Sequence, residues 1–207
     1  MRLLRLALAA ALVAGVTVAA RAGTLTDARV GFSADRTLVL DGHVYQGKIW
    51  TMPGMERHEQ VIKGFEPIFI LHAGSPLGEI VLPQLHTTVE FVFPRALRVL
   101  DDKRLTRHPV SHAVIEGIPT TKYAVDETTP EGHAVGTLWL SREGIPMRVA
   151  GTFTAPHGHV SSVRWELSHV RIGPQPAALF VPPHGYSRLP AEAVAPLLGL
   201  RLKSARH

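Results

Sequence analysis

The fold of this chain is clearest in residues 134–172, which read AVGTLWLSREGIPMRVAGTFTAPHGHVSSVRWELSHVRI. The stretch divides into three apolar-rich runs separated by the turn sequences REG and PHG. In the last run Val163, Trp165 and Leu167 alternate with polar residues, so one face of the segment is apolar and the other polar. Short alternating runs with turn residues between them predict consecutive antiparallel strands.

The same pattern continues toward the N-terminus. Asp41-Gly42, a dipeptide favoured in two-residue hairpin turns, separates a run ending at Leu40 from a return run beginning at His43. Further alternating runs follow, including one at residues 87–93. We therefore expect a mainly β protein of about ten antiparallel strands. A sheet of that width must curl, close or be covered, which favours a curved sheet or open half-barrel.

Two segments break the alternating pattern and predict short helices, at residues 94–105 and 191–202. One to three short helices are thus expected to cover the concave side of the sheet. So few helices can cover only part of the apolar face of a wide sheet. This favours a hollow that is not completely filled and has room for an apolar ligand.

Residues 1–22 have the three parts of a secretory signal peptide. Arg2 and Arg5 precede an uncharged apolar run, and Ala20-Arg21-Ala22 supplies small residues for cleavage. The expected product is a single β-rich domain, residues 23–207, in the periplasm. An uncleaved membrane anchor is the alternative, although the apolar run is short for a bilayer span.

The composition narrows the class of protein. The chain has no cysteine, which excludes disulfides and the lipid-anchoring cysteine of a bacterial lipoprotein. The net charge is +5, of which Arg2, Arg5 and Arg21 contribute three within the predicted signal peptide. No block of like charge suggests nucleic-acid binding.

No catalytic motif is present in the sequence. Gly74-Ser75-Pro76-Leu77-Gly78 has the wrong spacing for a nucleophile elbow, and there is no phosphate-binding loop. Twelve histidines are spread over the chain, with His157 and His159 flanking one turn. We therefore expect no enzyme activity, catalytic residue, metal or cofactor; a histidine-based metal-binding protein or hydrolase stays open as an alternative.

Large apolar side chains on the predicted strand faces are candidates for a ligand-binding trough. Most of them must also serve as ordinary core. The candidate trough residues are Phe32, Phe69, Phe91, Phe93, Met147, Phe153 and Trp165.

Several short motifs carry a family resemblance across residues 25–190. They include Met55-Glu56-Arg57-His58-Glu59, Gly136-Thr137-Leu138-Trp139 and the closing Leu179-Phe180-Val181-Pro182-Pro183-His184-Gly185-Tyr186. In this the chain resembles the LolA/LolB-like superfamily of periplasmic lipoprotein carriers. The resemblance implies an open half-barrel whose hollow takes acyl chains, and it makes Arg57 the candidate for an early-strand arginine that pins the lid.

The sequence therefore predicts a soluble exported binding protein. Its partner would be a lipid, a lipoprotein acyl chain or another apolar ligand, taken up in transient contact with a membrane. The alternative is an envelope module that binds another protein through its sheet surface and has a filled core.

Overall fold

The computed structural model describes residues 28–72, 75, 77–92, 107–130 and 132–194. Most of these residues lie in twelve strands, joined by two 3₁₀ turns and one short helix. The strands are β1 (Phe32–Leu40), β2 (His43–Met52), β3 (Met55–Gln60), β4 (Ile68–His72), β5 (Leu77–Leu82), β6 (Thr87–Val92), β7 (Arg107–Ile115), β8 (Ile118–Thr129), β9 (Gly132–Ser141), β10 (Pro146–Thr154), β11 (Val160–Ile172) and β12 (Ser187–Leu189). The other elements are η1 (Pro83–Leu85), η3 (Ala177–Phe180) and α3 (Ala191–Val194).

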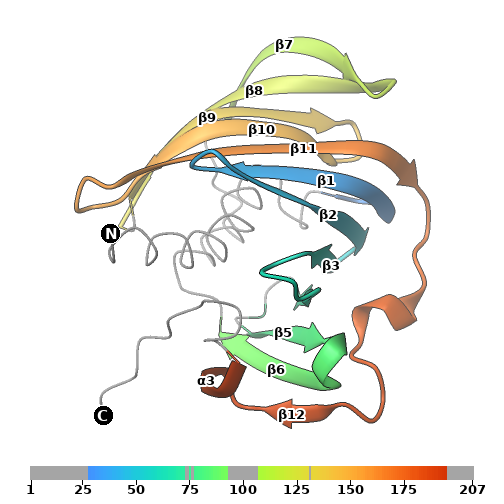
Figure 1. Cartoon of the computed structure of the whole chain (residues 1–207). Coiled ribbons are helices and arrows are strands. Elements are labelled where there is room, and N and C mark those ends of the chain that lie inside the picture. The colour runs from blue at the N-terminus through green and yellow to red at the C-terminus, as the bar shows by residue number, and fades with distance from the viewer. Residues whose placement is uncertain (1–27, 73–74, 76, 93–106, 131, 195–207) are drawn as a thin grey trace.

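All twelve strands belong to one sheet in the order β12-β6-β5-β4-β3-β2-β1-β11-β10-β9-β8-β7. β1 to β6 form one meander and β7 to β11 a second, and the antiparallel pairing of β1 with β11 joins the two. β12 pairs with β6 in parallel. The sheet curls into an open arc whose edge strands, β7 and β12, lie far apart (Figure 1).

Tight turns fix the register of neighbouring strands. Asp41 and Gly42 have φ values of 47° and 83°, as the two central residues of a type I′ turn require, and they join β1 to β2. Asp41 also accepts a hydrogen bond from the backbone N–H of Ser162 over 2.7 Å. The first hairpin is thereby attached to the hairpin of β10 and β11.

In β1 and β3, alternate residues turn toward the hollow of the arc and are buried there. In β1 every second residue from Phe32 to Leu40 is buried. Two apolar clusters result. The first lies on β1, β2 and β7 to β11 and includes Phe32, Leu38, Leu138, Met147 and Trp165. The second lies on β4 to β6 and includes Phe69, Ile80 and Val89, with Val194 from α3.

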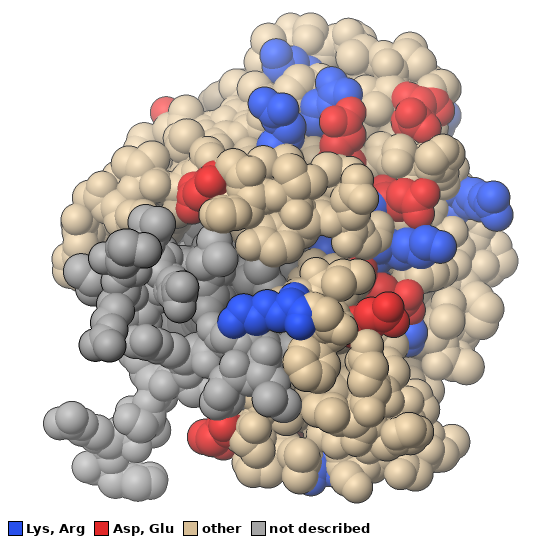
Figure 2. Space-filling model, viewed as in Figure 1, with Lys and Arg blue, Asp and Glu red and all other residues tan. Residues whose placement is uncertain are grey.

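Charged side chains are intermingled on the outer surface. On the face shown in Figure 2, lysine and arginine lie among aspartate and glutamate rather than in a field of one sign. The ion pair of Arg148 with Glu166 joins the neighbouring strands β10 and β11, and that of Arg188 with Glu79 joins β12 to β5 across β6. Exposed pairs of this kind contribute little to stability.

The structure confirms the mainly β, curved and open antiparallel sheet. It has twelve strands where about ten were expected, and β12, which the proline-rich segment after β11 supplies, is the strand that was not predicted. A tight turn at Glu116 and Gly117, where both φ values are positive, joins β7 to β8.

Three sequence predictions fall wholly or partly outside the described residues. The helix at 94–105 and the signal peptide at 1–22 lie outside them, and of the helix at 191–202 only Ala191–Val194 is described. Within the described part of the chain, no helix has the length and apolar character to cross a membrane.

Burial on the concave face should dominate stability. Leu138 on β9 is fully buried in the first cluster, so Leu138→Ala is expected to lower the free energy of unfolding by about 2–5 kcal/mol. Val135 on the same strand is 44% exposed, and Val135→Thr should change it by no more than about 0.5 kcal/mol. Urea denaturation measures both variants; equal losses would show that this face is not the core.

Candidate functional site: the hollow of the half-barrel

Buried polar side chains divide the two apolar clusters. Arg36 on β1 and Glu56, His58 and Gln60 on β3 are all buried on the concave face. Arg36 and His58 each have only 1% of their surface exposed. Buried polar and charged groups are unfavourable unless they are paired and hydrogen-bonded. These four side chains contact one another and together form a buried polar cluster.

The guanidinium of Arg36 reaches across a neighbouring strand to make its contacts. In the register, Arg36 lies opposite Gly47 on β2, and Gly47 lies opposite Gln60 on β3. Arg36 Nη1 donates to His58 Nδ1 at 2.9 Å, and Nη2 donates to Gln60 Oε1. A Cβ on residue 47 would lie 2.1 Å from the carbonyl oxygen of Glu59, so this crossing point requires glycine.

The hydrogen bonds of His58 define its protonation state. An arginine can only donate, so Nδ1 of His58 must be the unprotonated acceptor. Nε2 then carries the proton and donates to Glu56 Oε2 at 2.6 Å. Burial lowers the pKa of His58, and the nearby charge of Arg36 acts in the same direction, whereas Glu56 opposes both. His58 is therefore neutral in the folded protein at neutral pH.

Trp165 places an aromatic face beside this polar cluster. Its ring centroid is 5.3 Å from the guanidinium carbon of Arg36 and 6.2 Å from the His58 ring. Its indole N–H donates to the carbonyl of Pro146 at 3.1 Å, which fixes the ring. Burial lowers the pKa of Arg36 to about 10, so Arg36 stays charged at neutral pH. The cation is held by the aromatic face and two hydrogen bonds.

Some donors of the polar cluster remain unused. Arg36 Nε and Gln60 Nε2 are buried and have no hydrogen-bond partner among the described residues. A buried donor without a hydrogen-bond partner lowers the stability of the protein. A carbonyl or other acceptor that reached these two donors would remove that cost.

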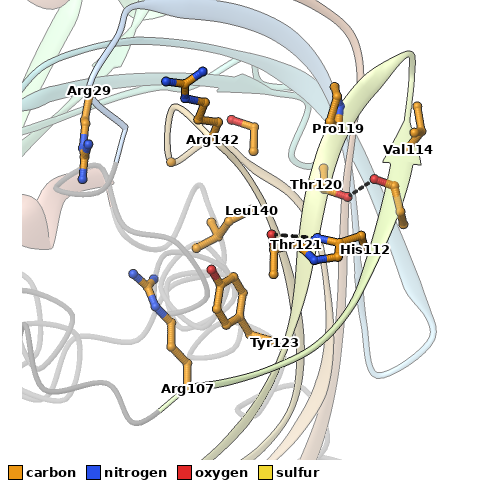
Figure 3. A pocket seen from close by; sticks show the side chains of 13 residues that line it. Arg29, Arg107, His112, Val114, Pro119, Thr120, Thr121, Tyr123, Leu140 and Arg142 are labelled. Atoms are coloured by element: carbon orange, nitrogen blue, oxygen red, sulfur yellow. Dashed lines mark hydrogen bonds between the residues drawn. The ribbon is translucent and has the colours of Figure 1, made fainter.

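A pocket of about 760 Å³ opens on the concave side at the β7 edge of the sheet. Leu140 on β9 and Tyr123 on β8 give it an apolar wall that continues into the first core cluster. Arg29, Arg107 and Arg142 also line it; Figure 3 shows Arg29 and Arg107 to one side of Leu140 and Tyr123, and Arg142 at the rim with its guanidinium turned away from them. The pocket is therefore apolar on one side and basic on the other.

The structure places six of the seven predicted trough residues. Phe32, Met147 and Trp165 are buried in the first cluster. Phe69 is buried in the second, where Phe91 packs against it edge to face at 6.4 Å between ring centroids.

The other two predicted trough residues belong to neither cluster as described. Phe153 is half-buried near the start of β9, where its ring lies close to Gly132. Phe93 lies outside the described residues. Contact of any of the seven with a ligand remains a prediction.

The buried arginine was not among the predicted site residues. Arg57, the residue considered for the lid-pinning position, points to the other face of β3, where it donates to the carbonyl of Leu179 at 2.9 Å. Among the described residues, Arg36 is the buried arginine on the concave face. The sequence does carry a signal for the position of Arg36. This residue lies an even number of residues from Phe32, Ala34 and Leu38, so in a strand it shares their face.

The histidines do not gather into a metal centre in the described part of the chain. There, no three His, Asp or Glu side chains come close enough together to hold a metal ion. His157 and His159 are both exposed beside the β10–β11 turn.

Comparison with known proteins shows similarity of fold. No protein-family model and no curated protein matches the chain. An uncharacterized conserved protein from Thermus thermophilus aligns with a TM-score of 0.52 at 10% identity, over 79% of this chain and 92% of that one. The LolA superfamily protein NE2245 from Nitrosomonas europaea aligns with a TM-score of 0.40 at 8% identity, over 79% and 97%.

A third similar structure is the Pseudomonas aeruginosa MucA/MucB complex. It aligns with a TM-score of 0.44 at 13% identity, over 78% of this chain and 58% of that one. The similar structures thus include a member of the superfamily that the sequence motifs resemble. At these identities the likeness is one of fold alone.

Acid should destabilise the protein through His58. The unfolded chain takes up a proton on this residue near pH 6.5, whereas the folded chain keeps it neutral, so stability is lost as pH falls below that value. The loss is up to about 1.4 kcal/mol per pH unit. His58→Gln keeps one acceptor and one donor but cannot titrate, so it should reduce the loss in stability between pH 7.5 and 5.5.

Chemical denaturation at both pH values measures this effect. His157→Gln, at an exposed position, is the matched control and should keep the wild-type pH dependence. If His58→Gln and the wild type lose stability equally, then His58 is not neutral in the folded state.

Proposed function

We propose that this chain is an exported, periplasmic binding protein that carries or senses an apolar ligand in the hollow of its half-barrel. The ligand would be a lipid, a lipoprotein acyl chain or another molecule with a long apolar part. The working unit would be a single domain, residues 23–207, released by cleavage near Ala22. Binding would be non-covalent and would need neither cofactor nor metal.

The observation that carries this proposal is the continuity between core and pocket. Leu140 belongs to the first apolar cluster and also lines the pocket, so a guest entering there meets the apolar face of the sheet directly. The volume of about 760 Å³ lies within the range of small-molecule sites. Each CH₂ group removed from water contributes about 0.8 kcal/mol, which favours transfer of an acyl chain into such a site.

An open sheet also suits a carrier. Because the arc is not closed, a ligand can enter and leave between its edges without unfolding the sheet (Figure 1). Such a protein would meet a membrane only transiently, when it collects or delivers its ligand.

Native mass spectrometry of protein purified from the cells that produce it, followed by organic extraction, tests the proposal. We expect a bound species that is released by solvent and carries a long apolar chain. A ligand-free mass together with no binding of an added C12 amphiphile would contradict the proposal.

Filling the pocket should displace the ligand. Thr121 lines the pocket, and Thr121→Trp should reduce ligand occupancy about tenfold or more, because an overpacked site loses about 1–3 kcal/mol or more. Thr152→Trp, at an exposed position on β10, is the matched control and should keep wild-type occupancy. Equal occupancy in both variants would place the ligand elsewhere.

The edge strand β7 favours a second candidate function, binding of another protein. Among the described strands, β7 has a neighbour on one side only, and it exposes Val110 at 59% and Val114 at 69%. An unpaired edge with exposed apolar side chains can accept an extended segment as an added strand. Absence of any extractable ligand, combined with loss of a partner in Val110→Lys, would favour this function.

A further inference from the structure

We propose that the pocket beside β7 to β9 binds the anionic headgroup of an amphiphile, a carboxylate or a phosphate, while the apolar tail lies along Leu140 and the core beyond it. This inference rests on the proposed function and narrows its ligand class. It assigns the site to acidic amphiphiles rather than to neutral lipids.

Three arginines from separate parts of the chain line this pocket. Arg29 precedes β1, Arg107 begins β7, and Arg142 follows β9. No aspartate or glutamate is among the described residues that line it. Each guanidinium offers several donors in a planar fork that matches a carboxylate or phosphate, so together they favour an anion.

Two of these arginines are not committed to structural pairs. Within the described part of the chain, the side chains of Arg29 and Arg142 make no ion pair, whereas Arg57 and Arg148 are paired with Glu59 and Glu166. Both Arg29 and Arg142 are exposed. Their donors are therefore accessible to a ligand without breaking an existing contact.

The third arginine joins the basic side to the apolar side. The guanidinium carbon of Arg107 lies 5.3 Å from the centroid of the Tyr123 ring, and Tyr123 packs against the first core cluster. Leu140 lies on the neighbouring strand β9 and lines the same pocket. Arginines at the rim of the pocket, with apolar surface behind them (Figure 3), match an amphiphile that has a charged headgroup and an apolar tail.

The experiment compares four C12 probes that share one tail: dodecanoate, dodecyl phosphate, dodecanol and dodecyltrimethylammonium. Isothermal titration below the micellar concentration gives Kd for each with the purified full chain. We expect both anions to bind on the order of 10- to 100-fold more tightly than dodecanol, because charge-assisted hydrogen bonds to arginine distinguish them. The tighter anion identifies the headgroup chemistry.

The double variant Arg29→Gln/Arg142→Gln should remove most of that preference, with the affinity for both anions falling toward that for dodecanol. Arg164→Gln/Arg171→Gln removes two exposed arginines from β11 and is the matched control for net charge. It should keep the preference for anions.

The outcomes separate the two proposals. Equal binding of all four probes would overturn the anionic headgroup site and leave the apolar binding function standing. A preference for anions that survives in Arg29→Gln/Arg142→Gln would also overturn the site. No binding of any probe would remove the proposed function, and this inference with it.

Discussion

The pairing of β1 with β11 is the interaction on which the rest of the structure depends. It joins two meanders that are each built from local hairpins, and it brings together strands that are far apart in the sequence. Leu38 lies opposite Trp165 and Arg36 opposite Leu167 in this pair. The continuous concave face exists only because that register is kept.

A buried cation at the centre of this face makes the register specific. A slip of one residue in β1 would move Arg36 to the outer face and turn its polar neighbours toward the core. The contacts of Arg36 with His58 and Gln60 require the observed register of β1, β2 and β3, and its contact with Trp165 requires that of β1 and β11. Each of these buried polar side chains would destabilise the protein on its own. Because they hydrogen-bond one another only in this arrangement, together they select one strand register.

Sequence reasoning predicted the sheet well because its strands are bounded by turn chemistry. Asp41-Gly42 and the runs of residues 134–172 specify hairpins through local geometry alone. The site could not be predicted, because Arg36 meets Trp165 only after β1 pairs with β11, and the three pocket arginines come together only when β7 and β9 lie in the same sheet as β1. Arg29, Arg107 and Arg142 are distant in sequence and form no motif.

The central claim is that the concave face, and not the outer face, receives the ligand. Methyl NMR of selectively labelled protein during titration with dodecanoate tests it most directly. The account predicts shift changes at Leu140, Ile145 and Met147, which belong to the first core cluster, and none at Val44 and Val160, which are exposed. Changes confined to Val44 and Val160, or none at any methyl group, would contradict it.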